Sequence, residues 1–261
     1  MPVSLKESLK NKNLTIGSWL SLGYPSICEI MAKAGFDWLV VDLEHTNIDY
    51  NEASQLIRII DLAGSVPLVR VGENNPTMIK RVMDSGAHGV VVPMVNSRKE
   101  AEQAIESVYY PPIGKRGVGL FRAQKYGLGF DEYSEWLLTE AVVIVQIEHI
   151  KGVENLEDII SVDGVDGFII GPYDLSGSLK LPGQFDHSLV KEALQEVEKV
   201  MLKSEKVGGY HIVHPNPSEL ESKTSKGYKF IAYGDDMVFF AEKVRDESEV
   251  LTKKQLLKES K

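Results

Sequence analysis

The sequence predicts an α/β fold, a (β/α)8 TIM barrel that fills residues 1–261 as a single domain. Short apolar runs alternate with amphipathic stretches from one end of the chain to the other. Runs such as WLVVD and VVIVQIE are almost continuously apolar, which is typical of parallel strands covered on both faces. The length of 261 residues also fits one barrel of about 250 residues, and no linker divides the chain.

The apolar runs predict eight strands, a number that closes most simply into a barrel. Apolar residues at helical spacing predict the helices between them, for example at 51–63 and 187–203. We expect the strands at residues 15–20, 37–42, 67–71, 89–93, 142–148, 167–170, 207–213 and 229–233. A left-handed helix end is predicted where a glycine stands between a helix and a strand, at Gly35, Gly86, Gly164 and Gly227.

Two segments depart from this repeat. Residues 111–138 form a long connection before the fifth strand, and loops of that length are uncommon unless they are functional. We therefore expect this connection at the end of the barrel where the strands end, with Arg122 helping to bind a ligand there. Residues from about 235 to 258 predict a terminal helix.

Charge and cysteine content exclude several classes of protein. The chain has 38 acidic and 29 basic residues, whereas a nucleic-acid binder needs a clustered basic surface. Cys28 is the only cysteine, which excludes an internal disulfide framework and a CxxC site. There is no apolar stretch of membrane-spanning length and no secretory signal. We expect a cytoplasmic protein with a small-molecule partner and no nucleic-acid or membrane partner.

Polar residues gather where the predicted strands end, on the face that carries the active site of a (β/α)8 barrel. Glu148 and Asp174 end neighbouring strands, and two carboxylates there repel each other unless a cation or proton lies between them. Hard oxygen ligands suit Mg²⁺ or Mn²⁺, with Co²⁺ as a further option. The strand ends carry Asp42, Glu44, His45, Arg70, Gln146, Glu148, Gly171, Pro172, Tyr173 and Asp174.

An inward-facing arginine and a nearby histidine indicate chemistry on an anion. Arg70 requires an anionic partner, which is a substrate oxygen or else an ion pair with Glu44 or Asp42. His45 lies three residues after Asp42, whose carboxylate can support it as a general base, although a loop histidine is more often inert. Asp174 alone can equally cap the helix that follows it.

Other chemistries find less support. No lysine ends a strand, which disfavours a Schiff-base mechanism. Asp235 and Asp236 would repel a phosphate at the last strand. Of the pair in HIVH, we interpret His211 as structural and His214 as a rim residue of unknown role, because positions three apart on a strand face opposite sides.

These residues carry a resemblance to a known family. The chain resembles the HpcH/HpaI aldolases, metal-dependent class II pyruvate aldolases, from about residue 15 to 240. The ordered matches are VDLEH at 41–45, PLVR at 67–70, MDSGA at 83–87, VPMV at 92–95, YPPIGKRG at 110–117, QIE at 146–148, GPYDLS at 171–176 and GYKF at 227–230 leading into YGD at 233–235.

The resemblance implies a phosphoenolpyruvate/pyruvate-type barrel in a homo-oligomer, a hexamer that exchanges C-terminal helices. It implies a divalent metal ion held by Glu148 and Asp174. Gln146 and the backbone around Gly171, Pro172 and Tyr173 would bind the substrate, the backbone amides holding its carboxylate. Tyr173 replaces the alanine of many relatives, which puts the identity of the aldehyde in doubt.

The same resemblance implies roles for the charged residues. Arg70 would bind the keto oxygen and stabilise the enolate, and His45, supported by Asp42, would act as base through a bound water. Asp84 would reach the active site of a neighbouring subunit, so that the oligomer becomes part of the catalyst.

The predicted function is reversible cleavage of a 4-hydroxy-2-oxo acid, of the 2-keto-3-deoxy acid type, to pyruvate and an aldehyde. This makes the protein an aldehyde-lyase. Three alternatives remain open. They are a CoA-thioester lyase of the citrate lyase β-chain type, an oxaloacetate decarboxylase that forms the same enolate, and a non-enzymatic binding barrel.

Overall fold

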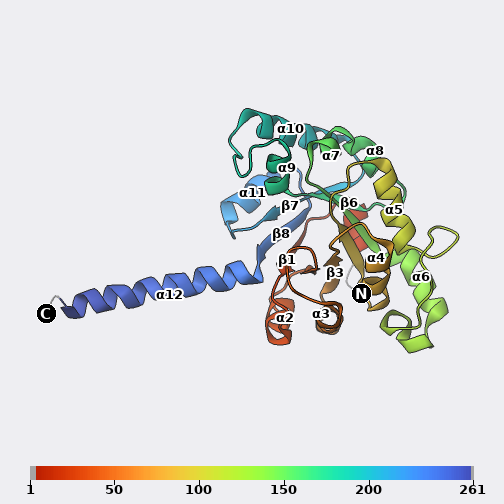
Figure 1. The fold of residues 1–261 in the computed structure, drawn as a ribbon, viewed down its shortest axis with the longest axis horizontal. Coiled ribbons are helices and arrows are strands. Elements are labelled where there is room, and N and C mark those ends of the chain that lie inside the picture. Colours follow the sequence, from red (N-terminus) through yellow and green to blue (C-terminus); the bar gives the residue numbers. More distant parts are fainter. Residues whose placement is uncertain (1–3, 260–261) are drawn as a thin grey trace.

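Parallel strands close into a barrel at the centre of the molecule (Figure 1). The structure, a computed structural model, describes residues 4–259, with side chains for residues 4–251. Each strand pairs with its sequence neighbours, and β1 pairs with β8 to close the ring. The strands are β1 (Thr15–Leu20), β2 (Trp38–Asp42), β3 (Val66–Arg70), β4 (Gly89–Val92), β5 (Val142–Ile147), β6 (Gly167–Ile170), β7 (Val207–Ile212) and β8 (Phe230–Asp235).

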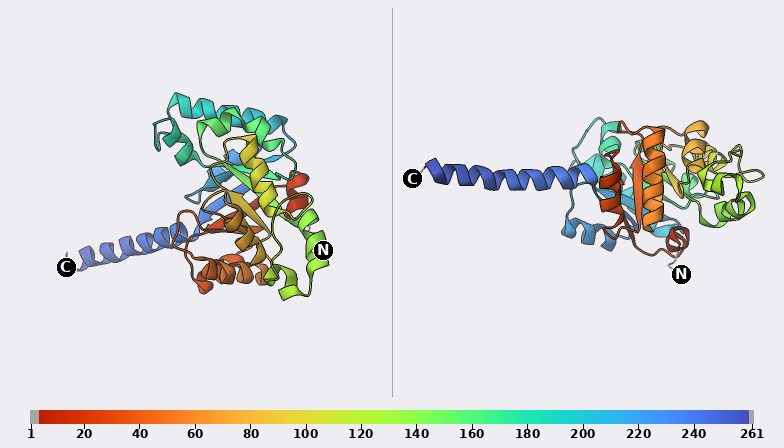
Figure 2. Two further views of the ribbon diagram at one scale, coloured as in Figure 1. Left: turned by 45° about the vertical axis from the view of Figure 1, so that its right-hand side comes forward. Right: turned by 90° about the horizontal axis from the view of Figure 1, so that it is seen from below.

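Helices surround this barrel, and α12 projects away from it (Figures 1 and 2). No helix in the described part of the chain is both long and apolar enough to span a membrane. The helices are α1 (Leu5–Lys10), α2 (Pro25–Ala32), α3 (Tyr50–Ala63), α4 (Pro76–Asp84), α5 (Arg98–Val108), the 3₁₀ helix η1 (Arg122–Gly127), α6 (Phe130–Glu140), α7 (Ile150–Glu154), α8 (Leu156–Ile160), α9 (Pro172–Ser178), α10 (Ser188–Lys203), α11 (Pro217–Ser225) and α12 (Asp236–Glu259).

The predicted (β/α)8 barrel is therefore confirmed, and most predicted strand ends fall within a residue or two of the observed ones. The glycines predicted at helix ends all have φ between 95° and 102°, the left-handed region that favours glycine. The prediction for residues 111–138 is wrong in part, because this segment contains η1 and most of α6 and only its first portion is irregular.

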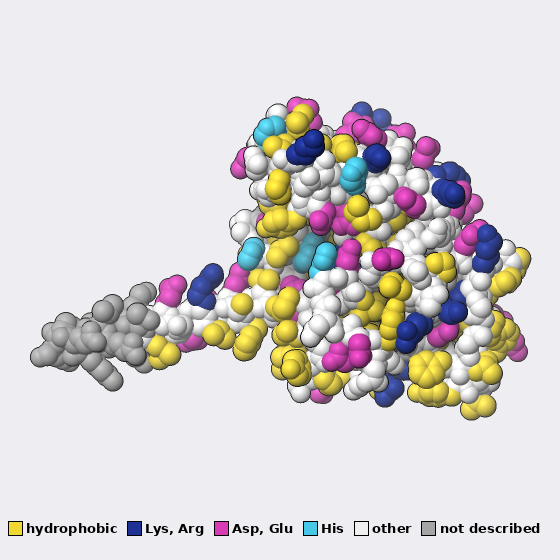
Figure 3. Space-filling view, in the orientation of Figure 1, with side chains coloured by type: hydrophobic (Ala, Val, Ile, Leu, Met, Phe, Trp, Pro, Cys, Tyr) yellow, Lys and Arg dark blue, Asp and Glu magenta, His cyan; other side chains and the backbone are white. Residues whose placement is uncertain are grey.

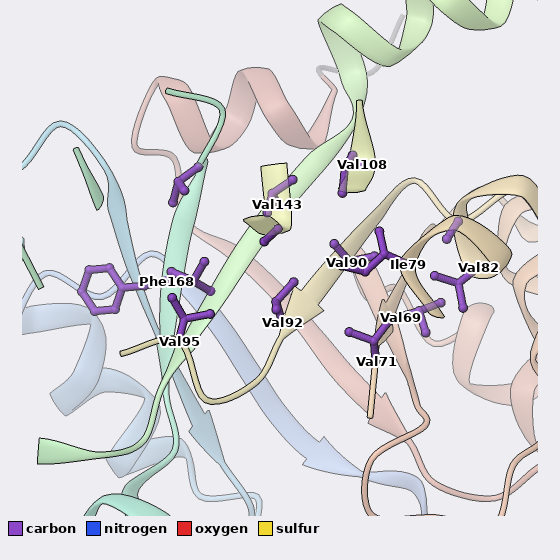
Figure 4. Packing of buried hydrophobic residues seen from close by; sticks show 14 of the residues in the cluster. Val69, Val71, Ile79, Val82, Val90, Val92, Val95, Val108, Val143 and Phe168 are labelled. Atoms are coloured by element: carbon purple, nitrogen blue, oxygen red, sulfur yellow. The ribbon is translucent and has the colours of Figure 1, made fainter. Parts of the chain in front are cut away.

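Alternation along each strand separates two hydrophobic layers. Successive side chains of a strand point to opposite faces, so every second residue faces the barrel interior. Trp38 and Phe230 fill the interior with stacked rings whose centroids lie 4.0 Å apart. The alternate residues of each strand pack outward against the helices, as Val69, Val90 and Val143 do in Figure 4.

One glycine makes the interior packing possible. Gly17 on β1 is paired with Trp38 on β2, and a Cβ atom at position 17 would overlap the Trp38 indole and its carbonyl oxygen. Because the indole is already stacked on Phe230, it has no free space into which to move.

We expect Gly17→Ala to lower the free energy of unfolding by about 3 kcal/mol, through overpacking of the barrel interior. Urea denaturation followed by circular dichroism measures the change. Gly117→Ala is the matched control, since a Cβ atom there meets nothing within 4 Å, and its stability should stay near that of the unsubstituted protein. Equal stability of the two variants would contradict this account of the interior.

Candidate active site

A cavity of about 210 Å³ opens at the C-terminal ends of the strands. Its walls combine an arginine, a carboxylate, two histidines and the backbone at the start of α9. Of the residues that the sequence places in the site, those that line the cavity are His45, Arg70, Gln146, Gly171, Pro172, Tyr173 and Asp174. Asp42 and Glu148 lie directly behind this wall, where they contact Arg70 and Gln146.

The arginine is fixed by a two-pronged ion pair. Asp42 and Arg70 are partners in the register of β2 and β3, so both side chains leave the sheet at the same height. Arg70 donates from Nε to Oδ1 of Asp42 at 2.8 Å and from Nη2 to Oδ2 at 2.7 Å. Its Nη1 lies 3.2 Å from Oε2 of Glu44. Both ion pairs considered from the sequence therefore form, and they hold the guanidinium in one orientation.

Glu148 is a buried carboxylate with each oxygen assigned a donor. Met94, which has φ of 53°, donates its backbone N–H to Oε1 at 2.7 Å, and Gln146 donates its side-chain amide to Oε2. A Cβ atom on Gly171 would lie 2.8 Å from Oε2, so only glycine leaves this oxygen unobstructed. Burial raises the pKa of Glu148, although these hydrogen bonds act in the opposite direction.

The rim holds more negative charge than Arg70 can neutralise. Burial raises the pKa of Glu44 to about 7, and Glu148, Asp42 and Asp174 add to this effect against the opposing charge of Arg70. The Oε2 atom of Glu44 is buried and accepts no hydrogen bond. This donor set of carboxylate oxygens fits a hard divalent cation. Within residues 4–251, no three acidic, histidine or cysteine side chains form a ready-made metal cluster, so a cation would need further ligands.

The predicted support of His45 by Asp42 is wrong in this structure. Asp42 is committed to Arg70 and also accepts the backbone N–H of Glu44 at 3.0 Å. The carboxylate beside His45 is instead Glu44, whose Oε2 lies 3.8 Å from Nε2 of the imidazole. The side chain of His45 is 61% exposed and borders the cavity, so it is accessible to substrate.

His211 lines the cavity, although the sequence interpretation made it structural. Its ring lies beside Trp19, with centroids 5.3 Å apart. Val207 on the same strand belongs to the interior layer, and residues at +2 and +4 from it share that face. This two-residue period is the sequence signal that could have identified His211 as inward-facing. His214 instead lies outside the cavity and contacts Glu242 on α12 at 2.8 Å.

Arg122 does not lie on this rim of its own chain. It pairs with Asp61 in the last turn of α3 and borders a separate cavity of about 410 Å³ that Gly86 and His88 also line. Those residues precede the N-terminal ends of β3 and β4, at the opposite end of the barrel. The prediction of a substrate contact by Arg122 is therefore wrong within the chain, because η1 and α6 must return the chain to the start of β5.

Asp84 also lies outside the cavity of its own chain. It is the last residue of α4, and burial raises the pKa of its carboxyl against the opposing charge of Arg116. Tyr173, by contrast, lies at the mouth of the cavity with its ring 4.9 Å from that of Phe185.

A parallel barrel with carboxylates, an arginine and a histidine at its C-terminal rim defines an enzyme that acts on an oxygen-rich anion. The chain belongs to the HpcH/HpaI aldolase/citrate lyase family, whose sequence pattern matches residues 15–242. The predicted family is thus confirmed.

Particular relatives narrow the activity. The chain is 35% identical over 240 residues to the 5-keto-4-deoxy-D-glucarate aldolase of Shigella dysenteriae, covering 92% of this chain and 93% of that one. An HpcH/HpaI aldolase/citrate lyase family protein from Burkholderia cenocepacia is 30% identical with a TM-score of 0.89, covering 95% and 98%. The citrate synthase SbnG is 28% identical with a TM-score of 0.84, covering 97% and 98%. The family match and the 5-keto-4-deoxy-D-glucarate aldolase relative confirm the predicted aldolase, a carbon–carbon lyase.

The crowding of carboxylates at the rim predicts a cost in stability. Below pH 4.5, the usual pKa of glutamate, Glu44 is protonated in both the folded and the unfolded protein. As the pH rises to about 7, the unfolded chain ionises first, so folding is penalised by up to about 3 kcal/mol. Glu44→Gln should therefore stabilise the metal-free protein at about pH 8 and have little effect near pH 4.5.

Thermal unfolding in EDTA at both pH values measures this difference. Glu192→Gln is the control, since this glutamate is exposed on α10 and its replacement should change stability little at either pH. A Glu44→Gln variant that is less stable than the unsubstituted protein at pH 8 would contradict the charge argument.

Proposed function

We propose that this aldolase cleaves a 4-hydroxy-2-oxo acid of the 2-keto-3-deoxy sugar acid class to pyruvate and an aldehyde, reversibly and with a divalent metal ion. The observation that carries the proposal is the excess of carboxylates around Arg70, with Glu44 and Glu148 both raised in pKa. A cation relieves that repulsion and an oxo-acid substrate supplies the missing oxygen ligands. The name of the 5-keto-4-deoxy-D-glucarate aldolase supports the substrate class.

Glu148 and Asp174 would hold the metal ion, with Mg²⁺ and Mn²⁺ preferred and Co²⁺ as a further candidate. Bound there, the ion would polarise the 2-keto group and lower the barrier to enolate formation. The backbone N–H groups at the start of α9, around Gly171, Pro172 and Tyr173, together with Gln146, would bind the carboxylate end of the substrate.

Side chains of this chain would bind the keto oxygen and move the proton. The hydrogen bonds of Arg70 to Asp42 occupy Nε and one N–H group of Nη2, so N–H groups of Nη1 and Nη2 remain that could bind the keto oxygen. His45 accepts the proton of the C4 hydroxyl, and the C3–C4 bond breaks. The electron pair of the C3–C4 bond passes to the pyruvate half, which becomes an enolate that Arg70 stabilises. Protonation at C3 gives pyruvate, and the aldehyde leaves.

Removal of metal should abolish pyruvate release from a 4-hydroxy-2-oxo acid, and Mn²⁺ or Mg²⁺ should restore it. Glu148→Gln should lower kcat about a thousandfold, whereas Glu154→Gln on the surface of α7 should leave it unchanged. Coupling to lactate dehydrogenase measures the pyruvate. A pyruvate adduct trapped on a lysine by borohydride would overturn the metal-dependent mechanism.

We also propose that the enzyme is a cytoplasmic homo-oligomer, a hexamer in which α12 packs on a neighbouring subunit. Exposed apolar side chains recur along α12 at helical spacing, at Met237, Phe240, Val244 and Leu251. Figure 3 shows hydrophobic side chains along the described part of this projecting helix. Asp84, remote from its own cavity, would then complete the site of a neighbour.

Mixing two inactive variants tests the shared site. Asp84→Asn and Glu148→Gln subunits, unfolded together in equal amounts and reassembled, should regain about one quarter of the activity of the unsubstituted enzyme. In a random mixture, one quarter of the sites take Glu148 from an Asp84→Asn subunit and Asp84 from a neighbouring Glu148→Gln subunit, and only these sites are intact. Each variant reassembled alone should stay inactive. If the mixture stays inactive as well, Asp84 does not serve a neighbouring site.

A further inference from the structure

His211 belongs to the inward face of β7 at the height of the reacting groups. Val207 packs in the barrel interior, whereas Tyr210 and Ile212 pack outward, so the alternation directs His211 inward. Ile170 of β6 is paired with Tyr210 of β7, which places Gly171 and His211 side by side on neighbouring strands. His211 therefore lies next to the backbone that would bind the pyruvate half.

The hydrogen bonding of the imidazole defines its tautomer. Nε2 lies 3.2 Å from the carbonyl oxygen of Gly234, and a carbonyl only accepts, so Nε2 carries the hydrogen. Burial also lowers the pKa of His211 to about 4, which keeps the ring neutral at physiological pH. Nδ1 is then an acceptor, and among the described residues it has neither a hydrogen-bond partner nor complete burial.

An acceptor in this position selects its ligand by chemistry. A carboxylate or phosphate brings only acceptors, and an alkyl group would leave Nδ1 unpaired. An ammonium group would meet the guanidinium of Arg70, which lies 4.5 Å from the Trp19 ring beside His211. The remaining common donor among small metabolites is a neutral hydroxyl.

We propose that His211 makes the enzyme selective for hydroxylated aldehydes, by accepting through Nδ1 a hydrogen bond from a hydroxyl of the aldehyde half. This inference rests on the proposed function, since it requires an aldehyde half. It assigns the substrate as a 2-oxo-3-deoxy acid with a hydroxyl beyond C4. The cleaved C4 hydroxyl is a separate group, which His45 deprotonates.

The test measures the aldol addition of pyruvate to each of two aldehydes in the presence of Mn²⁺. The two aldehydes, glycolaldehyde and acetaldehyde, differ by one hydroxyl. His211→Leu removes the acceptor at similar volume, so kcat/KM for glycolaldehyde should fall about tenfold while that for acetaldehyde changes less than about twofold. His211→Gln retains an acceptor oxygen and should recover most of the preference. His187→Leu, which removes an imidazole from the exposed start of α10, is the control and should keep the preference of the unsubstituted enzyme.

The outcomes separate this inference from the function on which it rests. If the unsubstituted enzyme forms no product from pyruvate with any aldehyde, the proposed function fails and the role of His211 fails with it. If product forms but His211→Leu lowers kcat/KM equally for glycolaldehyde and acetaldehyde, His211 only supports the barrel. The selectivity assignment is then overturned. Should His211→Leu fail to fold, a glycolaldehyde preference in His211→Gln no greater than about twofold overturns the assignment equally.

Discussion

The rest of the site depends on the closure of the parallel barrel, because closure decides which side chains reach the rim. In a closed sheet every second residue is directed inward, and the register between strands sets its height. Asp42 and Arg70 are register partners, and His211 faces the same interior from β7. These three side chains, far apart in the sequence, thus enter one small volume directly from rigid strands, and the other site residues follow the strand ends.

Charge is the second constraint on this volume. Asp42, Glu44 and Glu148 surround the guanidinium of Arg70, with Asp174 close enough to act on both glutamates, and burial is the chief cause of the raised pKa of Glu44 and Glu148. Such an arrangement reduces the stability of the empty protein and becomes favourable only with a bound cation or proton. Gly171 belongs to the same arrangement, since any larger residue would cover the oxygen of Glu148. The raised pKa values predict that a bound cation or proton stabilises the site.

Much of this could be predicted from the sequence, because barrel strands are apolar runs and active residues follow them. The failures have physical causes. Arg122 was placed on the rim because its segment is long, but η1 and α6 carry that segment to the other end of the barrel. Asp42 was assigned to His45 by proximity along the chain, whereas cross-strand register gives it to Arg70. Sequence spacing shows which residues are neighbours along the chain. The register between strands decides which side chains meet in the folded barrel.

The role proposed for His211 would separate the residues that set selectivity from those that carry the chemistry. The groups proposed for the pyruvate half lie on β2, β3, β5 and at the start of α9, where burial and mutual ion pairs restrict substitution. His211 makes one hydrogen bond to a backbone carbonyl, packs beside Trp19 and borders the cavity, and Tyr173 at the mouth is half-exposed. Neither side chain hydrogen-bonds to the Arg70–Asp42 pair or to Glu148 within the described residues. If the proposed roles hold, substitutions at His211 and Tyr173 could change the aldehyde that this fold accepts without changing the groups proposed to stabilise the enolate.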